Sequence, residues 1–293
     1  MIEFLASYGS LADLILFNSL LAFSQYIVLR AGLFSLGTAA FAALGAYAAA
    51  LCVTKAGLPA SAGLAAALAI GTVAGAMVAL PLSRLRGVFQ ALATLALVQI
   101  VLSAAINATS ITNGSIGINS IPKSVGTSVL LGTVLVVVLL LRALGANSVG
   151  RAFDVIREDE TVAVTLGISV HKHHMIAFIL SGAIAGLAGG LHALNSYSIT
   201  PGVFGFQMLV NVLAMVVLGG SMTVWGALCG AIILSLLPEL FRVFSDYRMV
   251  MHGLLLGLVI IFLPRGVADT LIVKWRDHKL SKRRTATTGG AVA

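Results

Sequence analysis

Long apolar stretches alternate with short polar connections along most of this chain. Stretches of about 20 apolar residues, the length that crosses a hydrocarbon core of about 30 Å, recur from residue 11 to residue 263. This pattern predicts an all-α polytopic membrane protein with about nine transmembrane helices, and eight to ten are compatible with it. The expected spans are 11–29, 31–53, 60–82, 88–107, 127–144, 174–195, 206–220, 224–241 and 247–263.

An uncharged turn separates the seventh and eighth of these spans. It runs from Gly219 and Gly220 to Thr223 and contains no residue that would anchor it at a membrane surface. The two spans are therefore also compatible with a broken or re-entrant pair of helices. Irregular backbone at membrane depth is tolerated only beside protein or a water-filled cavity, so this alternative would place Gly219 and Gly220 on a transport path.

Composition and charge place the chain in a membrane and orient it there. Charged residues make up 10% of the sequence, whereas soluble domains carry about 25%. With the N-terminus outside and the C-terminus inside, fourteen of the 18 Lys and Arg residues fall on cytoplasmic connections. We expect one transmembrane domain over residues 1–272 and a basic cytoplasmic tail over 273–293. Such a tail beside a membrane span marks the anionic inner leaflet, so we expect no nucleic-acid binding.

The residue types needed for catalysis or metal binding do not occur in convincing patterns. Cys52 and Cys229 lack metal-ligand spacing, so we expect no metal site. No nucleophile, base and orienting group occur together, so we expect no enzyme. The chain also lacks a G-x-x-x-x-G-K-[ST] loop, which means that it cannot cradle ATP in the Walker manner.

A charge-dense segment from Gly150 to Gly167 interrupts the apolar pattern. Six ionisable residues fall within ten positions there, and apolar residues recur between them at helical spacing. This predicts a short helix beginning near Val149, capped by Asn147 or Ser148, within a cytoplasmic loop over 145–172. Gly150 would free the start of the helix and Gly167 would end it. An ordinary solvated loop is the alternative interpretation.

Small and polar residues inside the spans indicate helix packing and a possible path. Gln207 and Asn211 stand four residues apart on one helix face, as do Gln99 and Ser103. Polar residues in a membrane either line a path or bond neighbouring helices, and both readings stay open. The candidate path residues are Thr94, Gln99, Gln207, Asn211, Gly219 and Gly220. Glycine pairs at helical spacing predict close helix contacts at Gly71/Gly75, Gly182/Gly186, Gly186/Gly190, Gly226/Gly230 and Gly253/Gly257.

Seven segments, in order along the chain, resemble one family of membrane proteins. They are LFSLGTAAFAALGAY from Leu33, RLRGVFQ followed by TL from Arg84, TNGSIGINSIP from Thr112, GRAFDVIREDE from Gly150, AFILSGAIAGLAGGL from Ala177, MVVLGG from Met215 and PRG from Pro264. The chain resembles the bacterial ABC importer permeases of the branched-chain amino acid family, of the LivM-like type. It departs from the family pattern at Asn211, Met222 and near His174.

The resemblance implies a multi-pass subunit of the bacterial cytoplasmic (inner) membrane that moves branched-chain amino acids inward. Its implied partners are a second, LivH-like permease, two ATP-binding subunits that hydrolyse the ATP, and a periplasmic substrate-binding protein; no cofactor is expected on this chain. The implied coupling residues are Gly150, Arg151, Arg157, Glu158, Glu160 and Gly167. The loop from Thr112 to Pro122 is expected to cap the periplasmic side.

Two alternatives remain open at the level of sequence. Similar scaffolds move urea, short amides or sugars, so the substrate class is not settled by the resemblance. A secondary carrier that works without ATP is a rival of another class. The spans contain no carboxylate far from their ends, which argues against ion coupling.

Overall fold

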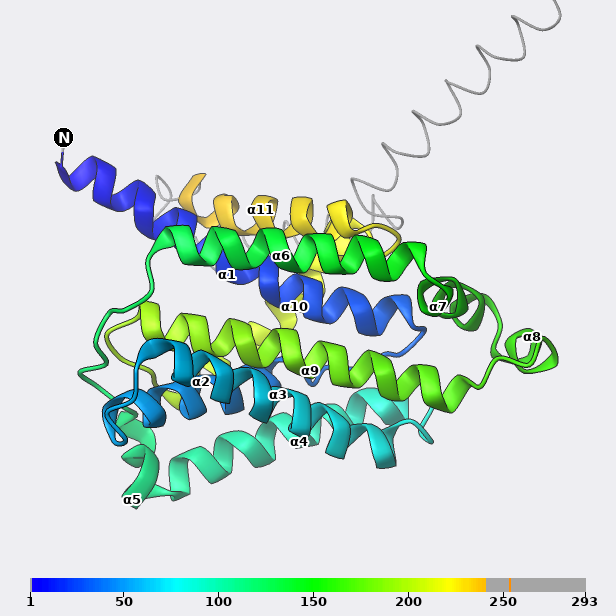
Figure 1. Ribbon diagram of the computed structural model, residues 1–293, viewed down its shortest axis with the longest axis horizontal. Helices are drawn as coiled ribbons and strands as arrows, with labels where there is room; N and C mark the ends of the chain where they lie inside the picture. Colours follow the sequence, from blue (N-terminus) through cyan, green and yellow to red (C-terminus); the bar gives the residue numbers. More distant parts are fainter. Residues whose placement is uncertain (1, 241–252, 254–293) are drawn as a thin grey trace, which may run out of the picture.

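Apolar helices of membrane-spanning length dominate the computed structural model, which describes residues 2–240 and residue 253 (Figure 1). Six stretches are long and apolar enough to cross a membrane, and two shorter apolar helices accompany them. The expectation of an all-α polytopic membrane protein is confirmed. The six are α1 (Ile2–Arg30), α3 (Ala60–Leu82), α4 (Val88–Asn107), α6 (Thr127–Ala146), α9 (Val170–Asn195) and η2 (Pro201–Phe204) with α10 (Phe206–Gly219); the shorter two are α2 (Thr38–Thr54) and α11 (Val224–Leu240).

Eight of the nine expected spans correspond to these helices. The ninth, at 247–263, and the basic tail at 273–293 lie outside the described residues. Four short elements complete the described chain: α5 (Thr109–Thr112), η1 (Gly114–Ile116), α7 (Ser148–Glu158) and α8 (Glu160–Thr165).

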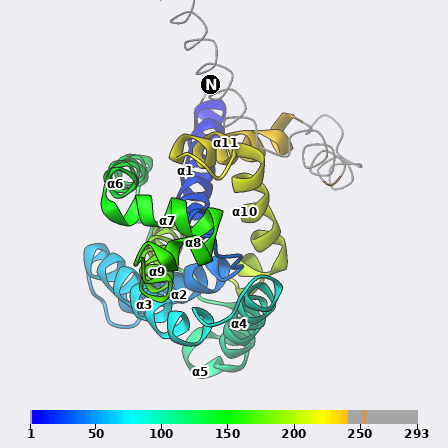
Figure 2. The same cartoon turned by 90° about the vertical axis from the view of Figure 1, so that its right-hand side faces the viewer.

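Helix α9 lies at the centre of the bundle, with α2 and α3 packed against it (Figure 2). Glycines form these contacts. A Cβ atom on Gly186 of α9 would stand 2.8 Å from the Cα atom of Gly71 in α3, and one on Gly75 would stand 3.2 Å from the Cα atom of Ile179. Apolar surface gives no drive for association in lipid, so close backbone contact supplies the dispersion energy instead. The predicted packing role of these glycines is confirmed.

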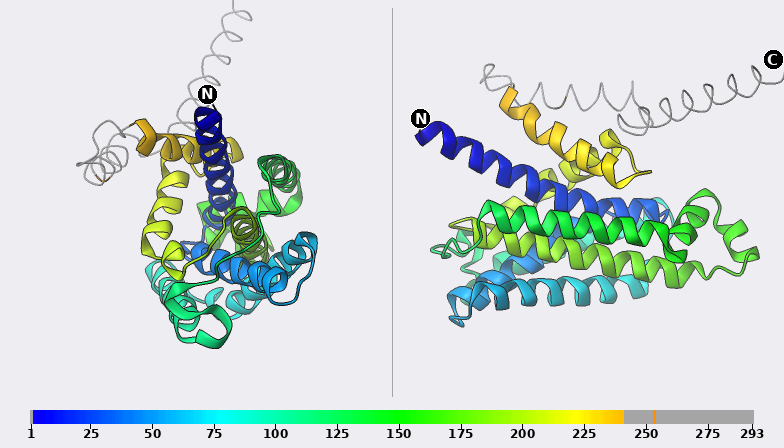
Figure 3. Two further views of the ribbon diagram at one scale, coloured as in Figure 1. Left: turned by 90° about the vertical axis from the view of Figure 1, so that its left-hand side faces the viewer. Right: turned by 45° about the horizontal axis from the view of Figure 1, so that its top comes forward.

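The two ends of the bundle differ in what they carry. One end, which we call the α7–α8 end, holds α7, α8, the connections 31–37 and 83–87, and the turn 220–223 (Figure 3). The orientation expected from the charge pattern places the 145–172 loop, the connection 83–87 and the turn 220–223 on the cytoplasmic side, whereas residues 31–37 belonged to an expected span. At the opposite end, the loop after α5 pairs with the loop after α9. Ile118 N–H donates to the Ile199 carbonyl at 3.0 Å, and Ile199 N–H donates to the Ile118 carbonyl at 2.9 Å. The expected cap at 112–122 is thus a hydrogen-bonded structure.

The expected helix over 31–53 begins later than its hydrophobicity suggested. Residues 33–36 are not helical, and α2 starts at Thr38. Side chains of other helices satisfy this backbone: Gln25 Nε2 donates to the Ser35 carbonyl at 2.8 Å, Phe34 N–H donates to Gln90 Oε1 at 3.0 Å, and Leu36 N–H donates to Thr94 Oγ1 at 2.8 Å. Buried backbone can leave the helical state only when such partners replace the lost bonds.

Candidate functional site

The charge-dense segment forms two short helices rather than one. α7 begins at Ser148 with Asn147 as N-cap, although no side chain there makes the capping hydrogen bond. The backbone then breaks at Asp159, whose carboxylate accepts from Thr161 N–H at 2.7 Å and Val162 N–H at 3.2 Å and so starts α8. These two donors lower the pKa of Asp159 below its ordinary value. Gly167, with a φ of 78°, follows α8 as expected.

The α7–α8 unit packs its apolar face on the bundle. Of the apolar positions at helical spacing, Ala152, Ile156 and Ala163 are buried as expected, whereas Leu166 is 65% exposed; Phe153 is buried as well. Gly150 has another role than the expected one. It lies inside the first turn of α7, where a Cβ atom would stand 2.7 Å from the Cα atom of Gly145, so its small size lets α7 fold back against the end of α6.

The strongest ionic contact of this unit joins α7 to α1. Arg30, the last residue of α1, donates from Nε to Asp154 Oδ1 at 2.8 Å and from Nη2 to Asp154 Oδ2 at 2.9 Å. The Arg30 side chain is only 13% exposed, and its Nη1 also donates to the Tyr26 hydroxyl at 3.1 Å. The sequence did not predict this pair, because Arg30 and Asp154 entered the sequence analysis only as members of the count of charged residues.

The expected coupling residues contact the rest of the chain in three different ways. Arg157 is half-buried; its Nη1 donates to the Ser221 carbonyl at 3.4 Å, and its Nη2 contacts Met222 Sδ in the α10–α11 turn. Glu160 pairs with Arg86 at 3.1 Å, and Arg151 donates to the Ala146 carbonyl at the end of α6 at 2.9 Å. Glu158 is exposed.

These contacts join the α7–α8 unit to several parts of the bundle at once. It reaches α1 through Arg30, the α3–α4 connection through Arg86, the end of α6 through Arg151, and the α10–α11 turn through Arg157. A displacement of this unit would therefore act on helices that lie far apart in the sequence. Such an arrangement suits the transfer of motion from the α7–α8 end into the membrane.

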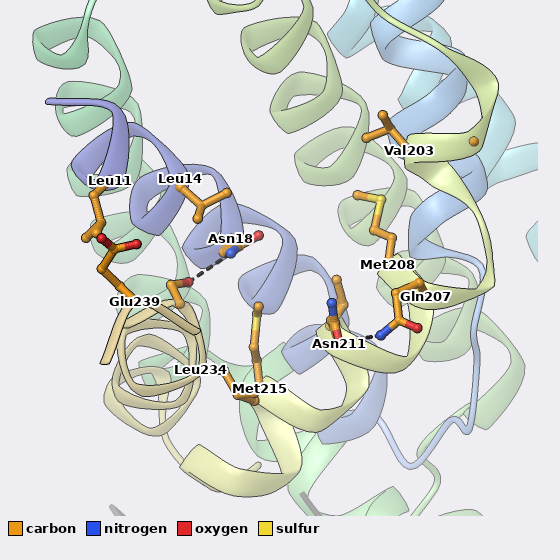
Figure 4. Close-up of a pocket in the computed structure, with 13 residues that line it drawn as sticks. Leu11, Leu14, Asn18, Val203, Gln207, Met208, Asn211, Met215, Leu234 and Glu239 are labelled. Carbon is orange, nitrogen blue, oxygen red and sulfur yellow. Dashed lines mark hydrogen bonds between the residues drawn. The ribbon is translucent and has the colours of Figure 1, made fainter. Parts of the chain in front are cut away.

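A cavity of about 450 Å³ opens between α1, η2, α10 and α11 (Figure 4). We call it the path cavity. Gln207 Nε2 donates to Asn211 Oδ1 at 3.2 Å on one wall, and Asn18 Nδ2 donates to Ser235 Oγ at 2.8 Å on the other. The remaining lining is mostly apolar, with Leu14, Met208 and Met215 among it.

The six expected path residues are not gathered in one place. Gln207 and Asn211 line the path cavity, and Asn18, Ser235 and Glu239, which were not selected as path residues, line it with them. Thr94 instead bonds the 33–36 backbone, and Gln99 lies exposed on α4. Gly219 packs against α11 near Gly226, and Gly220 begins the turn at the α7–α8 end with a φ of 108°. α10 and α11 are continuous helices joined by that turn, over the residues described.

Comparison with known proteins assigns the chain to a family. The family model described as "Branched-chain amino acid transport system / permease component" matches residues 9–264. The chain belongs to this permease family. Within the described residues of this permease, no three His, Cys, Asp or Glu side chains come together as a metal site.

Several curated relatives of this permease come from bacteria. It is 33% identical to the high-affinity branched-chain amino acid transport system permease protein LivM of Escherichia coli K12, over 82% of this chain and 65% of the relative. It is 32% identical to LivM of Salmonella typhimurium LT2, over 90% of this chain and 71% of the relative. The LivH permease of Escherichia coli K12 is 29% identical over 41% of this chain and 40% of its own length. No solved structure matches the chain.

Proposed function

We propose that this chain is one membrane-spanning subunit of a bacterial ABC importer for branched-chain amino acids. In this proposal it lies in the cytoplasmic membrane beside a second permease. Two ATP-binding subunits dock at the α7–α8 end, and a periplasmic binding protein delivers substrate to the opposite end. The LivM and LivH relatives are permeases of branched-chain amino acid transport systems, which supports the substrate class.

The α7–α8 unit is the observation that carries the proposal. It stands at one end of the bundle, presents Arg151 and Glu158 to the outside, and is held to α1 and the α10–α11 turn by Arg30–Asp154 and Arg157. A partner that pushes this unit would pull on helices lining the path cavity. ATP-driven closure of partner subunits is a suitable source of that push.

The path cavity supports the need for a second permease. Gln207 is exposed and Asn211 half-buried on the membrane-embedded helix α10, so neither amide is covered by this chain alone. Polar side chains facing lipid are unfavourable and usually face a protein interior or a water-filled path. A neighbouring permease on this side would close the cavity and shield the amides.

Affinity purification of the tagged, full-length chain from its native membrane tests the assembly. We expect an ATP-binding protein and a second permease to be recovered with it, and we expect substrate-loaded binding protein to stimulate ATP hydrolysis by that complex. Recovery of the chain alone, with substrate transport in vesicles that lack ATP, would instead establish an independent carrier.

Competition experiments test the substrate class in the same vesicles. Unlabelled leucine, isoleucine and valine should each reduce the uptake of labelled leucine, whereas urea and ribose should not. Uptake that urea or ribose reduces, and that leucine does not, would assign the chain to another class of ABC permease.

A further inference from the structure

A second cavity, of about 250 Å³, lies between α1, α6 and α9, toward the end opposite α7–α8. We call it the outer cavity. Asp13, Lys123 and Asn195 supply charge and hydrogen-bonding groups to its lining, and Phe17 and Leu130 supply apolar surface. None of the contacts in the coupling or path regions uses these residues.

Two acceptor oxygens at the outer cavity lack donors. Asn195 Nδ2 donates to Asp13 Oδ2 at 2.9 Å, which joins α9 to α1. The other oxygen of each side chain, Asp13 Oδ1 and Asn195 Oδ1, is buried and has no hydrogen-bond partner within the described chain. Buried carboxylate and amide oxygens normally have partners, because water removed from them must be replaced. A ligand with several N–H donors and a positive charge fits both oxygens, and an ammonium group has these properties.

Lys123 gives the same cavity a positive group. Its ammonium does not pair with Asp13 in the part of the chain that the structure describes, although both residues line the cavity. A Lys side chain offers three donors and no acceptor, so its natural ligand is a carboxylate. A bare inorganic cation at Asp13 would be repelled by Lys123, whereas a zwitterion would satisfy both residues.

The apolar lining of the cavity completes the description of its ligand. Leu130 is 1% exposed and Phe17 is 6% exposed, and the Phe17 ring stacks on His192 with the ring centroids 4.3 Å apart. This wall is therefore held in place by packing. An aliphatic side chain placed against it would be removed from water.

We propose that the outer cavity binds a zwitterionic amino acid with a branched aliphatic side chain. Asp13 and Asn195 hold its ammonium group, Lys123 holds its carboxylate, and Phe17 and Leu130 face its side chain. The substrate class rests on the proposed function, but the site is separate from the path cavity. Leu14 lines both cavities, so the outer site lies next to the path cavity.

Half-ligands separate the two charged contacts. Saturation-transfer NMR titrations on the full-length chain would use L-leucine, isopentylamine, which lacks the carboxylate, and 4-methylpentanoate, which lacks the ammonium group. Asp13→Asn keeps an acceptor for Asn195 but removes the charge. This variant should lower the affinity for leucine and for isopentylamine at least about tenfold, and the affinity for 4-methylpentanoate should change by less than about twofold. Lys123→Gln should lower the affinity for leucine and for 4-methylpentanoate and leave the affinity for isopentylamine unchanged.

The control is Lys55→Gln, a change at a lysine of the same end that donates to the Ser110 carbonyl at 2.9 Å. It should leave all three affinities unchanged. The opposite selectivity of the Asp13 and Lys123 variants cannot arise from loss of folding, which would affect every ligand alike. Unchanged leucine affinity in both variants would overturn the proposal. The proposal would also be overturned if isopentylamine bound in choline chloride but no longer bound in sodium chloride. That result would show that an inorganic cation occupies the position beside Asp13.

Leucine uptake by the assembled complex is measured in parallel. If the complex takes up leucine but the Asp13 and Lys123 variants do not show opposite selectivity for the two half-ligands, the outer site is rejected and the proposed function is kept. The half-ligand pattern without uptake supports the site and rejects the proposed transport function.

Discussion

Arg30 and Asp154, 124 residues apart in the sequence, form an ion pair through two parallel hydrogen bonds of 2.8 and 2.9 Å. Arg30 ends α1, the helix that lines both the path cavity and the outer cavity, and Asp154 lies in α7. Two-point contacts between Arg and a carboxylate fix orientation as well as distance. The pair therefore ties the expected docking element to the helix that borders both cavities.

Exchanging the charges of this pair tests the link. Arg30→Glu or Asp154→Arg alone brings like charges together at the junction of α1 and α7, where Arg30 is 13% exposed and Asp154 is 54% exposed, and should reduce ATP-driven leucine uptake. The double variant restores an attractive pair and should recover part of it, with a coupling energy of about 1–3 kcal/mol in thermal unfolding. Purely additive losses would show that the two side chains do not depend on each other.

Removing the Arg157 side chain should disconnect the α7–α8 unit from the α10–α11 turn. Arg157→Ala loses the bond to the Ser221 carbonyl and the contact with Met222. We expect ATP hydrolysis to continue while substrate moved per ATP falls several-fold. Met222→Leu keeps the packing volume and the bond to Ser221, and should remain close to wild type. If the Arg157 variant moved as much substrate per ATP as the wild type, Arg157 would not take part in coupling.

Glycine substitutions test the packing around α9. Gly186→Ala places a methyl group 2.8 Å from the Cα atom of Gly71, and overpacking of this kind costs about 1–3 kcal/mol. Gly132→Ala is the matched control, because nothing lies within 4 Å of its Cβ position on α6. The control should be neutral or slightly stabilising, as Ala is the better helix former. Similar melting temperatures for the two variants would contradict the close contact of α3 with α9.

The Asp159 cap provides a pH-dependent test of α8. Thr161 and Val162 N–H groups lower the pKa of Asp159, so its stabilising effect is fully present above the ordinary Asp value of about 3.9. It is lost only as the pH falls through the lowered pKa. Hydrogen exchange of the backbone amides of residues 160–165, corrected for the intrinsic exchange rate at each pH, should therefore not change between neutral and mildly acidic conditions. Asp159→Ala should speed this exchange and Asp159→Asn, which can still accept, should not.

The amide pair of the path cavity is tested by removing its polarity. Gln207→Leu and Asn211→Leu together should lower leucine uptake at least about tenfold while the complex still assembles, because a lining without hydrogen-bonding groups cannot replace the hydration of a zwitterion. Gln99→Leu, at an exposed position outside the cavity, is the control and should transport normally. Unimpaired uptake in the double variant would place the path elsewhere.

The sequence predicted what depends on local pattern. Helical apolar stretches located eight spans. The spacing of Gly71 and Gly75 predicted close contact with a neighbouring helix, and the spacing of Gln207 and Asn211 predicted a shared face. Each of these features repeats within a few residues along one helix. Local periodicity is sufficient to reveal them.

Features that depend on distant partners could not be predicted in this way. The non-helical backbone at 33–36 exists because Gln25, Gln90 and Thr94 satisfy it from other helices. The Arg30–Asp154 pair and the unpaired oxygens of Asp13 and Asn195 likewise arise only when α1, α7 and α9 come together. The break at Asp159 had a local signal, an Asp two and three residues before the amides that it caps, but the charge run around it suggested one continuous element.

ATP-driven accumulation of labelled L-leucine, in proteoliposomes that hold this chain with its co-purified partners and binding protein, tests the central claim most directly. We predict accumulation against a gradient that requires hydrolysable ATP and fails with a non-hydrolysable analogue. Leucine that equilibrates equally well without ATP, or that does not enter while ATP is hydrolysed and urea or ribose accumulates, would contradict it.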